Sequence, residues 1–428
     1  MYPNLYYVFK DWFGVEWKAL SFLNTFGFMV AVAFIVAAIV LSSELKRKEK
    51  LALLLPREET IIVGKPASFF DLLINFITGF LFGYKLLGVI LSKPEELSPQ
   101  EYIFSSQGNW LAGILLGLLL AGLKWREKNK QKSKTPEQRS IRIWPHDRVG
   151  DIIVIGLVFG IIGAKIFDGL ENWEDFKAHP WERLFSAGGL TYYGGLILAA
   201  IAICTYGAKK NIKVIHLIDA AAPALILAYA VGRIGCQVAG DGDWGIYNSA
   251  YITDSTGKAV EAKPGEYKAQ LEKYSTHFLS GDRKHTTLDE VPNKAVKAPS
   301  YLPVWMVAYA YPQNVNKDGI VLPGIQDEHN TALPVPVFPT PFYETILCTL
   351  IFLILWAIRR QIKIAGLMTG IYLVFNGTER FVIEHIRVNN LINFLGMKVT
   401  QAEAISFSLV IAGILTIVYV LVSNKHKE

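Results

Sequence analysis

Apolar residues are concentrated in nine runs that are separated by polar segments. Most runs reach the length of roughly 17–25 residues that an α-helix needs to cross about 30 Å of hydrocarbon. The pattern therefore predicts an all-α polytopic membrane protein with about nine transmembrane helices. The runs lie at about 20–42, 69–91, 109–124, 151–169, 188–207, 214–236, 343–358, 364–385 and 403–423.

The composition agrees with a lipid environment. Of the 428 residues, 52% are hydrophobic and only 19% are charged, against about 25% charged residues in soluble domains. This balance excludes a disordered chain. The net charge of +6 fits basic loops on one side of a membrane and requires no nucleic-acid partner. The cysteines lie in or beside apolar runs without CxxC spacing, so we expect no disulfide framework, no metal site and no cofactor; they are Cys204, Cys236 and Cys348.

Lysine and arginine gather in alternate loops. Short loops rich in these residues face the cytoplasm, and an N-terminus outside with a C-terminus in the cytoplasm places every basic loop on that side. The acidic loops, such as the one with Glu171 and Glu174, then face outward. The basic loops begin near Lys46, Lys124, Lys209, Arg359 and Lys425.

One long polar segment, 246–337, separates the sixth and seventh runs. It is too hydrophilic to span a membrane, and the alternation of loops places it outside. We expect a small core of its own that includes Tyr301, Trp305 and Tyr309 to Tyr311. The predicted organisation has three parts, which are membrane helices 1–6 in residues 1–245, the outer insertion 246–337, and membrane helices 7–9 in residues 338–428.

The eighth run carries polar residues at helical spacing. Asn376, Arg380, Glu384 and Arg387 recur at intervals of four, four and three, which places them on one face of a helix. An ionisable residue inside a span is costly and is a functional candidate. The alternative is an ion pair that only holds helices together. Two arginines against one carboxylate would leave positive charge unpaired, which favours a functional site.

The sixth run ends in a glycine-rich segment, Gly232 to Cys236, and Asp241 follows it. Arg233 lies about 28 Å along its helix at 1.5 Å per residue, near the outer boundary of the membrane. The alternative is an arginine that only extends its side chain to the interface. Arg380 runs in the same direction and reaches a similar depth. Because guanidinium groups match phosphate oxygens in pairs, the two arginines are suited to one phosphate.

Two further segments begin helices at the outer face, Gly188 to Gly195 and Phe338 to Glu344. Taken alone, such glycines are packing positions and such tyrosines are interfacial anchors. Together with Arg233, Asp241 and Arg380, they place every unusual polar motif on the outer side. The sequence therefore predicts a site that faces the outer leaflet.

These four motifs resemble those of the bacterial prolipoprotein diacylglyceryl transferase family. The resemblance covers about 150–245 and 338–423, with a weaker match over the first run. The segments resemble, in chain order, the family's His-Gly-Gly loop at 189–195, its signature at 232–245, its His-Pro-x-x-x-Tyr-Glu helix start at 339–344 and its Arg-x-x-x-Glu-x-x-Arg helix at 380–387. The resemblance implies a seven-helix core in the bacterial inner membrane, with the runs at 69–91 and 109–124 as two extra helices.

The resemblance also implies an activity. Family members transfer the diacylglyceryl group of phosphatidylglycerol to the lipobox cysteine in the signal peptide of a prolipoprotein, which is the first step of bacterial lipoprotein maturation. The expected partners are phosphatidylglycerol, prolipoprotein signal peptides and membrane lipids. The alternative is a non-catalytic member that binds the same lipid or precursors. A secondary transporter would need broken helices and inverted repeats, and the sequence shows neither.

Site residues follow from the resemblance, position by position. The implied catalytic residues are Arg233, Arg380, Glu384, Asp241 and Tyr193. The implied phosphatidylglycerol contacts are Arg233, Arg380, Arg387, Gly194, Gly195 and Tyr343. The arginines stabilise the leaving phosphate. Glu384 either orients Arg380 or Arg233 or takes the thiol proton, and orientation is favoured.

The chain departs from the family pattern at several positions. Tyr193 replaces the usual histidine, and a hydroxyl with a pKa near 10 is a poor base at neutral pH. Asp241, which replaces a glutamate, therefore becomes a candidate proton acceptor, as do Asp243 and His385. Tyr193 is then expected to donate a hydrogen bond to a lipid oxygen. The remaining substitutions are Cys236 for asparagine, Phe26 for tyrosine and Phe338 for histidine, and Cys236 is expected to be a small packing residue.

Overall fold

The computed structural model describes residues 1–92, 102, 105–132, 137–185, 189, 191–279, 287–387, 391–394 and 397–425. The chain forms two compact units, which are described separately. Unit 1 comprises Met1–Leu41 and Ile218–Glu428, and unit 2 comprises Ser42–Leu217. The predicted boundaries at 245 and 337 both fall inside unit 1, and the three-part division stays a prediction.

All nine predicted runs coincide with helical segments, although residues 188 and 190 of the fifth run lie outside the described part of the chain. Among the described residues, six helical segments are long and apolar enough to cross a membrane. They are Thr25–Lys50, Phe69–Leu91, Pro145–Glu171, Val214–Ala239, Thr340–Ile358 and Gln401–Lys425. The chain is predominantly helical, in agreement with a polytopic membrane protein. The number of nine spans stays a prediction.

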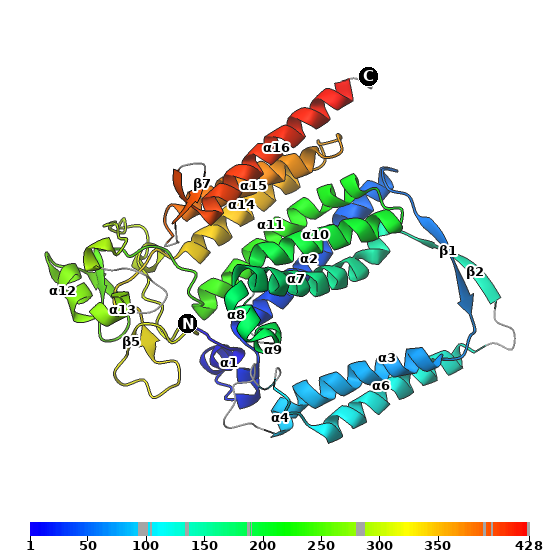
Figure 1. The fold of residues 1–428 in the computed structure, drawn as a ribbon, viewed down its shortest axis with the longest axis horizontal. Coiled ribbons are helices and arrows are strands. Elements are labelled where there is room, and N and C mark those ends of the chain that lie inside the picture. Colours follow the sequence, from blue (N-terminus) through cyan, green and yellow to red (C-terminus); the bar gives the residue numbers. More distant parts are fainter. Residues whose placement is uncertain are drawn as a thin grey trace. The chain divides into compact units, whose positions relative to one another are not determined.

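Unit 1 is built on long helices that share an apolar core. Its core residues come from three helices and are Ala222, Ile226, Ala230, Cys348, Ile351, Leu355 and Met368. Figure 1 shows α14, α15 and α16 running side by side. The helices are α1 (Leu5–Phe13), α2 (Thr25–Lys50, which continues into unit 2), α11 (Val214–Ala239, which begins in unit 2), α14 (Thr340–Ile358), α15 (Leu367–Glu384) and α16 (Gln401–Lys425), with a short 3-10 helix, η1 (Lys18–Phe22).

Two local features fix the start and the packing of α15. The Asp219 carboxylate on α11 accepts hydrogen bonds from the backbone N–H groups of Gly366, at 2.8 Å, and Thr369, at 3.0 Å. It therefore satisfies two of the donors that a helix start leaves open. Farther along, a Cβ at Gly377 would lie 2.7 Å from the Ser406 carbonyl oxygen. A glycine is required there because α15 and α16 approach so closely.

The insertion 246–337 has a core of its own at the end of unit 1 where α14 begins (Figure 1). The prediction that Tyr309 and Tyr311 belong to this core is confirmed, because Tyr311 is fully buried and Tyr309 packs against the core. The inclusion of Tyr301 and Trp305 was wrong, because these side chains are 81% and 39% exposed and neither belongs to the core. The core comprises Tyr247, Leu271, Phe278, Val291, Tyr311, Leu333, Val335 and Val337. The short elements are β3 (Tyr251–Thr253), β4 (Ala259–Glu261), α12 (Glu266–Lys273), α13 (Ser275–Leu279), η5 (Leu288–Glu290), η6 (Val304–Met306), β5 (Ile320–Val321) and β6 (Thr331–Ala332).

Unit 2 contains two helix pairs, α3 with α6 and α7 with α10. In the first pair, a Cβ at Gly79 or Gly83 would lie 2.6 Å or 2.3 Å from a backbone oxygen of α6, so small residues let the helices touch. The helical elements are α3 (Phe69–Phe82), the π-helical turn η2 (Gly83–Leu87), α4 (Gly88–Ser92), α6 (Trp110–Lys130), η3 (Pro145–Arg148), α7 (Val149–Glu171), α8 (Trp173–Ala178), α9 (Pro180–Phe185) and α10 (Tyr192–Lys209).

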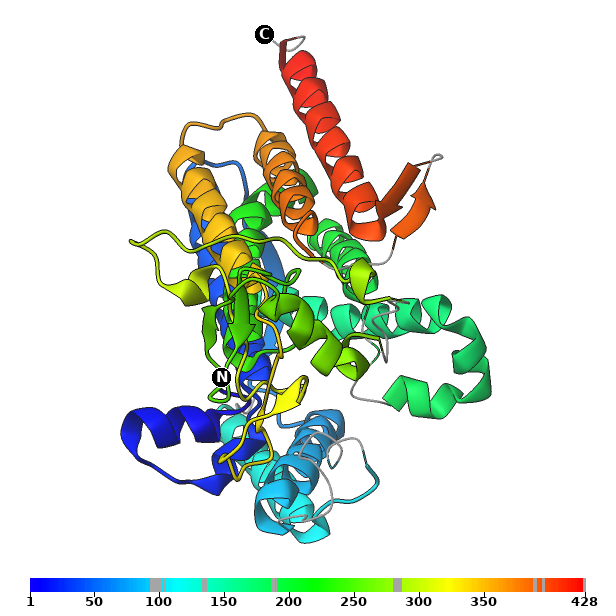
Figure 2. The ribbon, with the colours of Figure 1, turned by 90° about the vertical axis from the view of Figure 1, so that its left-hand side faces the viewer.

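The prediction of an all-α chain missed several short strands. The described residues include four two-stranded antiparallel sheets. The longest pairs β1 (Arg57–Val63) with β2 (Glu137–Ile143), in segments that the sequence analysis assigned to loops because of their charges. The β-branched residues at the end of β1, Thr60 to Val63, and the isoleucines of β2, Ile141 and Ile143, favour strands. Figure 2 shows another pair, β7 (Leu391–Phe394) and β8 (Met397–Thr400), beside the start of α16.

Candidate active site

Charged side chains from four segments of unit 1 meet between α11, α14 and α15. We call this group the arginine–carboxylate cluster, and its members are Arg233, Asp243, Glu344, Arg380, Glu384 and Arg387. Arg233 comes from the last turns of α11 and Asp243 from the turn that follows. Glu344 lies in the first turns of α14, and the other residues lie at the end of α15 and just beyond it.

Glu344 is the centre of the cluster. Its side chain is fully buried, and its Oε2 lies 2.5 Å from Arg233 Nε. Its Oε1 lies 3.0 Å from Arg380 Nη1 and 3.7 Å from Arg387 Nη1. A buried carboxylate is stable only when it is paired and hydrogen-bonded. One carboxylate therefore holds three guanidinium groups in a fixed arrangement.

Asp243 joins two of the same arginines from the other side. It forms an ion pair with Arg233, and its Oδ1 lies 2.5 Å from Arg387 Nη2. Burial alone would raise the pKa of Asp243, but the guanidinium groups of Arg233 and Arg387 outweigh burial and lower this pKa to about 2. The carboxylate is thus ionised at neutral pH and a weak base, which argues against Asp243 as the proton acceptor.

The turn that carries Asp243 is fixed by its backbone. Gly240 and Gly242 have φ angles of 67° and 95°, a region that favours glycine. The Gly245 N–H donates to the Phe338 carbonyl at 2.9 Å, and the Ile246 N–H donates to the Ile386 carbonyl at 2.8 Å. The glycine-rich signature therefore ties the end of α11 to the start of α14 and the end of α15.

The eighth run behaves as predicted in part. Arg380 Nη2 lies 3.2 Å from Glu384 Oε2, so the pair at spacing four is formed. The expectation that positive charge would remain unpaired on this face was wrong, because Asp243 and Glu344 reach Arg387 and Arg380 from other elements. The sequence of one helix does not show which carboxylates from other parts of the chain will pair with its arginines.

Aromatic and sulfur groups line the cluster beside Arg233. Arg233 Nε donates to the Tyr229 hydroxyl at 3.1 Å, and the Tyr229 hydroxyl donates to Glu344 Oε1 at 3.4 Å. The Cys236 sulfur lies 3.6 Å from Arg233 Nη1. Cys236 is buried, as a packing residue would be.

Asp241 lies close to this group. Burial raises its pKa, and its Oδ1 is buried without a hydrogen-bond partner among the described residues. The donor atoms of Cys236, Asp241 and Asp243 lie within 4.8 Å of one another, a spacing that could hold a metal ion. The set does not suit a cation, because Asp243 is already paired with two arginines. Asp241 retains the features of a proton acceptor.

Other residues named in the sequence analysis lie outside the arginine–carboxylate cluster. The Tyr343 hydroxyl donates to the Met306 carbonyl at 2.6 Å, which ties α14 to the insertion. The His385 side chain is 56% exposed, and its Nδ1 lies 2.8 Å from the Phe381 carbonyl oxygen. Phe338 is buried, and Phe26 packs near Gly235 on α11.

Tyr193, Gly194 and Gly195 belong to unit 2, at the start of α10. A Cβ at Gly194 would lie 2.3 Å from Phe167 Cβ, and one at Gly195 would lie 2.8 Å from the Gly160 carbonyl oxygen. The two glycines therefore let α10 pack closely on α7, which agrees with the packing alternative. Their contact with phosphatidylglycerol and the role of Tyr193 stay predictions.

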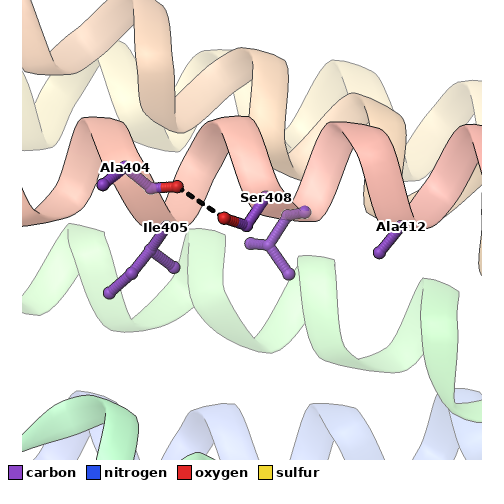
Figure 3. Close-up of a pocket in the computed structure, with 5 residues that line it drawn as sticks. Ala404, Ile405, Ser408 and Ala412 are labelled. Carbon is purple, nitrogen blue, oxygen red and sulfur yellow. Dashed lines mark hydrogen bonds between the residues drawn. The ribbon is translucent and has the colours of Figure 1, made fainter. Parts of the chain in front are cut away.

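An apolar cavity of about 350 Å³ lies along α16 (Figure 3). Its lining is Ala404, Ile405, Ser408, Leu409 and Ala412. The Ser408 hydroxyl donates to the Ala404 carbonyl at 2.8 Å, so this polar group is satisfied within the helix. The lining carries no charge, and the cavity suits hydrocarbon rather than a phosphate.

Sequence reasoning missed the central role of Glu344 and the bridging role of Asp243. Glu344 was part of a motif but was not assigned to the site. A glutamate that opens an apolar run is itself costly at membrane depth, and this signal could have identified it. Asp243 could not be paired with Arg387 from sequence, because 144 residues separate them.

The fold and the cluster define a polytopic membrane protein with a charged site enclosed among its helices. Residues 109–419 match the family described as prolipoprotein diacylglyceryl transferase. The match covers more than half of the chain, and the chain belongs to this family. The matched range includes α6, which the sequence analysis had left outside the family core, whereas α3 precedes it.

Individual relatives support the assignment. The chain is 27% identical over 317 residues to the phosphatidylglycerol–prolipoprotein diacylglyceryl transferase of Streptococcus uberis, covering 73% of this chain and 90% of that protein. It is 27% identical over 312 residues to the protein of the same name from Streptococcus agalactiae serotype Ia, covering 72% and 88%. The Leptospira interrogans serovar copenhageni protein of that name is 27% identical over 162 residues, covering 32% and 48%.

Proposed function

We propose that this protein transfers the diacylglyceryl group of phosphatidylglycerol to the lipobox cysteine thiol of prolipoproteins. The observation that carries the proposal is the arginine–carboxylate cluster, in which three arginines meet around Glu344 inside the matched range. A phosphate that leaves with growing negative charge needs hydrogen-bond donors that are already fixed in place, and the three guanidinium groups can supply them.

The chemistry is a displacement at the glycerol carbon beside the phosphate. The thiolate sulfur forms a bond to this carbon, the carbon–oxygen bond breaks, and its electron pair remains on the phosphate oxygen. Glycerol phosphate is released. Arg233 and Arg380 are assigned to the phosphate oxygens, because each guanidinium offers paired donors in a fixed plane.

Arg387 is the third phosphate contact. Its Nη1 is buried and has no hydrogen-bond partner among the described residues, although it lies 3.7 Å from Glu344 Oε1. A buried donor without an acceptor is costly. A phosphate oxygen would supply the acceptor, which supports the assignment of this side chain to phosphatidylglycerol.

The other site residues have supporting roles in this proposal. Glu384 orients Arg380 through its ion pair, and Asp241 is the candidate acceptor for the thiol proton. Tyr193 donates a hydrogen bond to a lipid oxygen, and Gly194, Gly195 and Tyr343 contact the lipid.

The proposed location is the inner membrane of a bacterium. The basic loops support an orientation with the N-terminus outside and the C-terminus in the cytoplasm. The insertion 246–337 then lies outside the membrane, where exported signal peptides are presented. An impermeant thiol reagent, applied to intact spheroplasts, should label a cysteine placed at 270 and spare one at 132.

Transfer in a defined system tests the proposed function. The purified protein is reconstituted in phosphatidylglycerol vesicles with a lipobox peptide, and the lipidated peptide and glycerol phosphate are both measured. Equal amounts of both products are expected, together with growth of cells depleted of their own transferase. Lipid binding without either product would favour the non-catalytic alternative.

A further inference from the structure

A second buried carboxylate lies directly before Arg380 on α15. The Glu379 side chain is 5% exposed, and both of its oxygens are buried without a hydrogen-bond partner among the described residues. Burying a carboxylate without partners is costly. A buried polar group that is left open in this way is characteristic of a functional site.

The surroundings of Glu379 are those of the proposed active site. Several groups interact electrostatically with the Glu379 carboxylate. They are Tyr229 and Arg233 of α11, Glu344 and Cys348 of α14, and Arg380, its neighbour on α15. Among the described residues, Glu379 forms no ion pair with either arginine, unlike Glu344. It lies near the arginines, and neither of its oxygens is hydrogen-bonded to another described residue.

The carboxylates of the cluster are less available. Asp243 is held by Arg233 and Arg387, and Glu384 by Arg380. Glu344 contacts three guanidinium groups. Each of these carboxylates is therefore already paired with at least one guanidinium group.

We propose that Glu379, in place of Asp241, accepts the proton of the substrate thiol and returns it to the departing phosphate. Both oxygens of Glu379 lack a hydrogen-bond partner among the described residues, whereas only Oδ1 of Asp241 does. This role rests on the proposed transferase function. The ionised carboxylate removes the thiol proton, and the resulting thiolate forms the sulfur–carbon bond while the carbon–oxygen bond breaks. The proton then passes from Glu379 to the phosphate of glycerol phosphate, so the carboxylate is regenerated and no other reactant is consumed.

The test compares Glu379→Gln with the wild-type protein in vesicles across pH 6 to 9. Glutamine keeps the shape but cannot accept the proton. We expect kcat at pH 7 to fall by about 10²-fold or more with an unchanged KM for phosphatidylglycerol. The rate should recover as pH rises, because the free thiol ionises by itself with a pKa of about 8.5. Glu379→Asp should restore part of kcat, and Glu272→Gln, an exposed change on α12, should retain the wild-type profile.

Several outcomes overturn the role. A Glu379→Gln protein with wild-type kcat and pH profile would do so. A loss that is equal at every pH and is not restored by aspartate would indicate packing instead. High-pH recovery in Asp241→Asn but not in Glu379→Gln would make Asp241 the acceptor. Absence of transfer by the wild-type protein would overturn the proposed function itself, and the role of Glu379 with it.

Discussion

Two helix interfaces in this protein are formed by different kinds of residues. In unit 2, α3 and α6 meet through glycines and aromatic rings, and the Lys85 ammonium donates to the Tyr102 and Gln107 carbonyls at 3.2 Å and 2.7 Å. In unit 1, α14 and α15 meet across Glu344 and Arg380. The first interface follows the usual rule for membrane helices, which associate through small residues.

The two interfaces are expected to differ in what they contribute to stability and to the proposed reaction. A buried ion pair contributes little net stability compared with apolar packing, because both charges must leave water. The glycine interface therefore provides association, while the charged one is the interface to which the proposed function assigns phosphate binding. Changes at the two interfaces should separate stability from catalysis.

The largest effect is expected for Glu344→Ala. This change leaves three guanidinium groups around an empty position. Breaking a buried charge pair in this way costs about 3–5 kcal/mol of folding free energy. Thermal unfolding in detergent should show a large fall in melting temperature, whereas Glu328→Ala, on the exposed surface of the insertion, should leave it unchanged. An unchanged melting temperature for Glu344→Ala would contradict the central role of this carboxylate.

The next effect concerns catalysis with the fold intact. Arg233→Lys keeps the charge but loses the paired donors, so transfer should fall by about 10²–10³-fold, as when one transition-state donor is removed. Initial rates in vesicles measure this change. Arg359→Lys, at the far end of α14, serves as the matched control. Near-normal transfer by Arg233→Lys would exclude the phosphate clamp.

A moderate effect is expected at the glycine interface. A Cβ at Gly83 would lie 2.3 Å from the Ala112 carbonyl oxygen, so Gly83→Leu must separate α3 from α6. Overpacking of this kind costs about 1–3 kcal/mol. Thermal unfolding should show the loss, while kcat per folded molecule stays at the wild-type value. A selective loss of kcat would mean that this helix pair takes part in the reaction.

The smallest effect appears on acidification. Because the pKa of Asp243 is lowered from 3.8 to about 2 in the folded protein, its ion pairs contribute stability above about pH 4. This contribution is lost as the pH falls from about 4 toward 2. Melting temperatures between pH 5 and 2 should therefore decline less steeply in Asp243→Asn than in the wild-type protein. Parallel curves would show that the Asp243 bridge is not formed in solution.

The sequence predicted the helices well because a membrane span has a strong one-dimensional signal. A run such as 403–423 must be helical, since lipid offers no other partner to its backbone. The spacing of Arg380 and Glu384 likewise predicted their ion pair. Both inferences depend only on residues that are close in the chain.

The composition of the cluster could not be predicted in the same way. Glu344 and Arg233 are 111 positions apart, and their contact depends on how α11 and α14 pack. The β1–β2 pairing also joins distant segments, and their many charges resemble those of loops. Contacts of this kind are set by tertiary structure, which hydrophobic periodicity does not describe.

The β1–β2 pairing has a consequence for how this chain is organised. Arg57 and Ile143 are cross-strand partners, so the two ends of the 87-residue stretch 57–143 are neighbours in space. Partners in an antiparallel pair have Cα atoms only about 4.5–5.5 Å apart. The whole stretch, including α3 and α6, could be excised and its ends rejoined by a short turn without rerouting the remaining polypeptide.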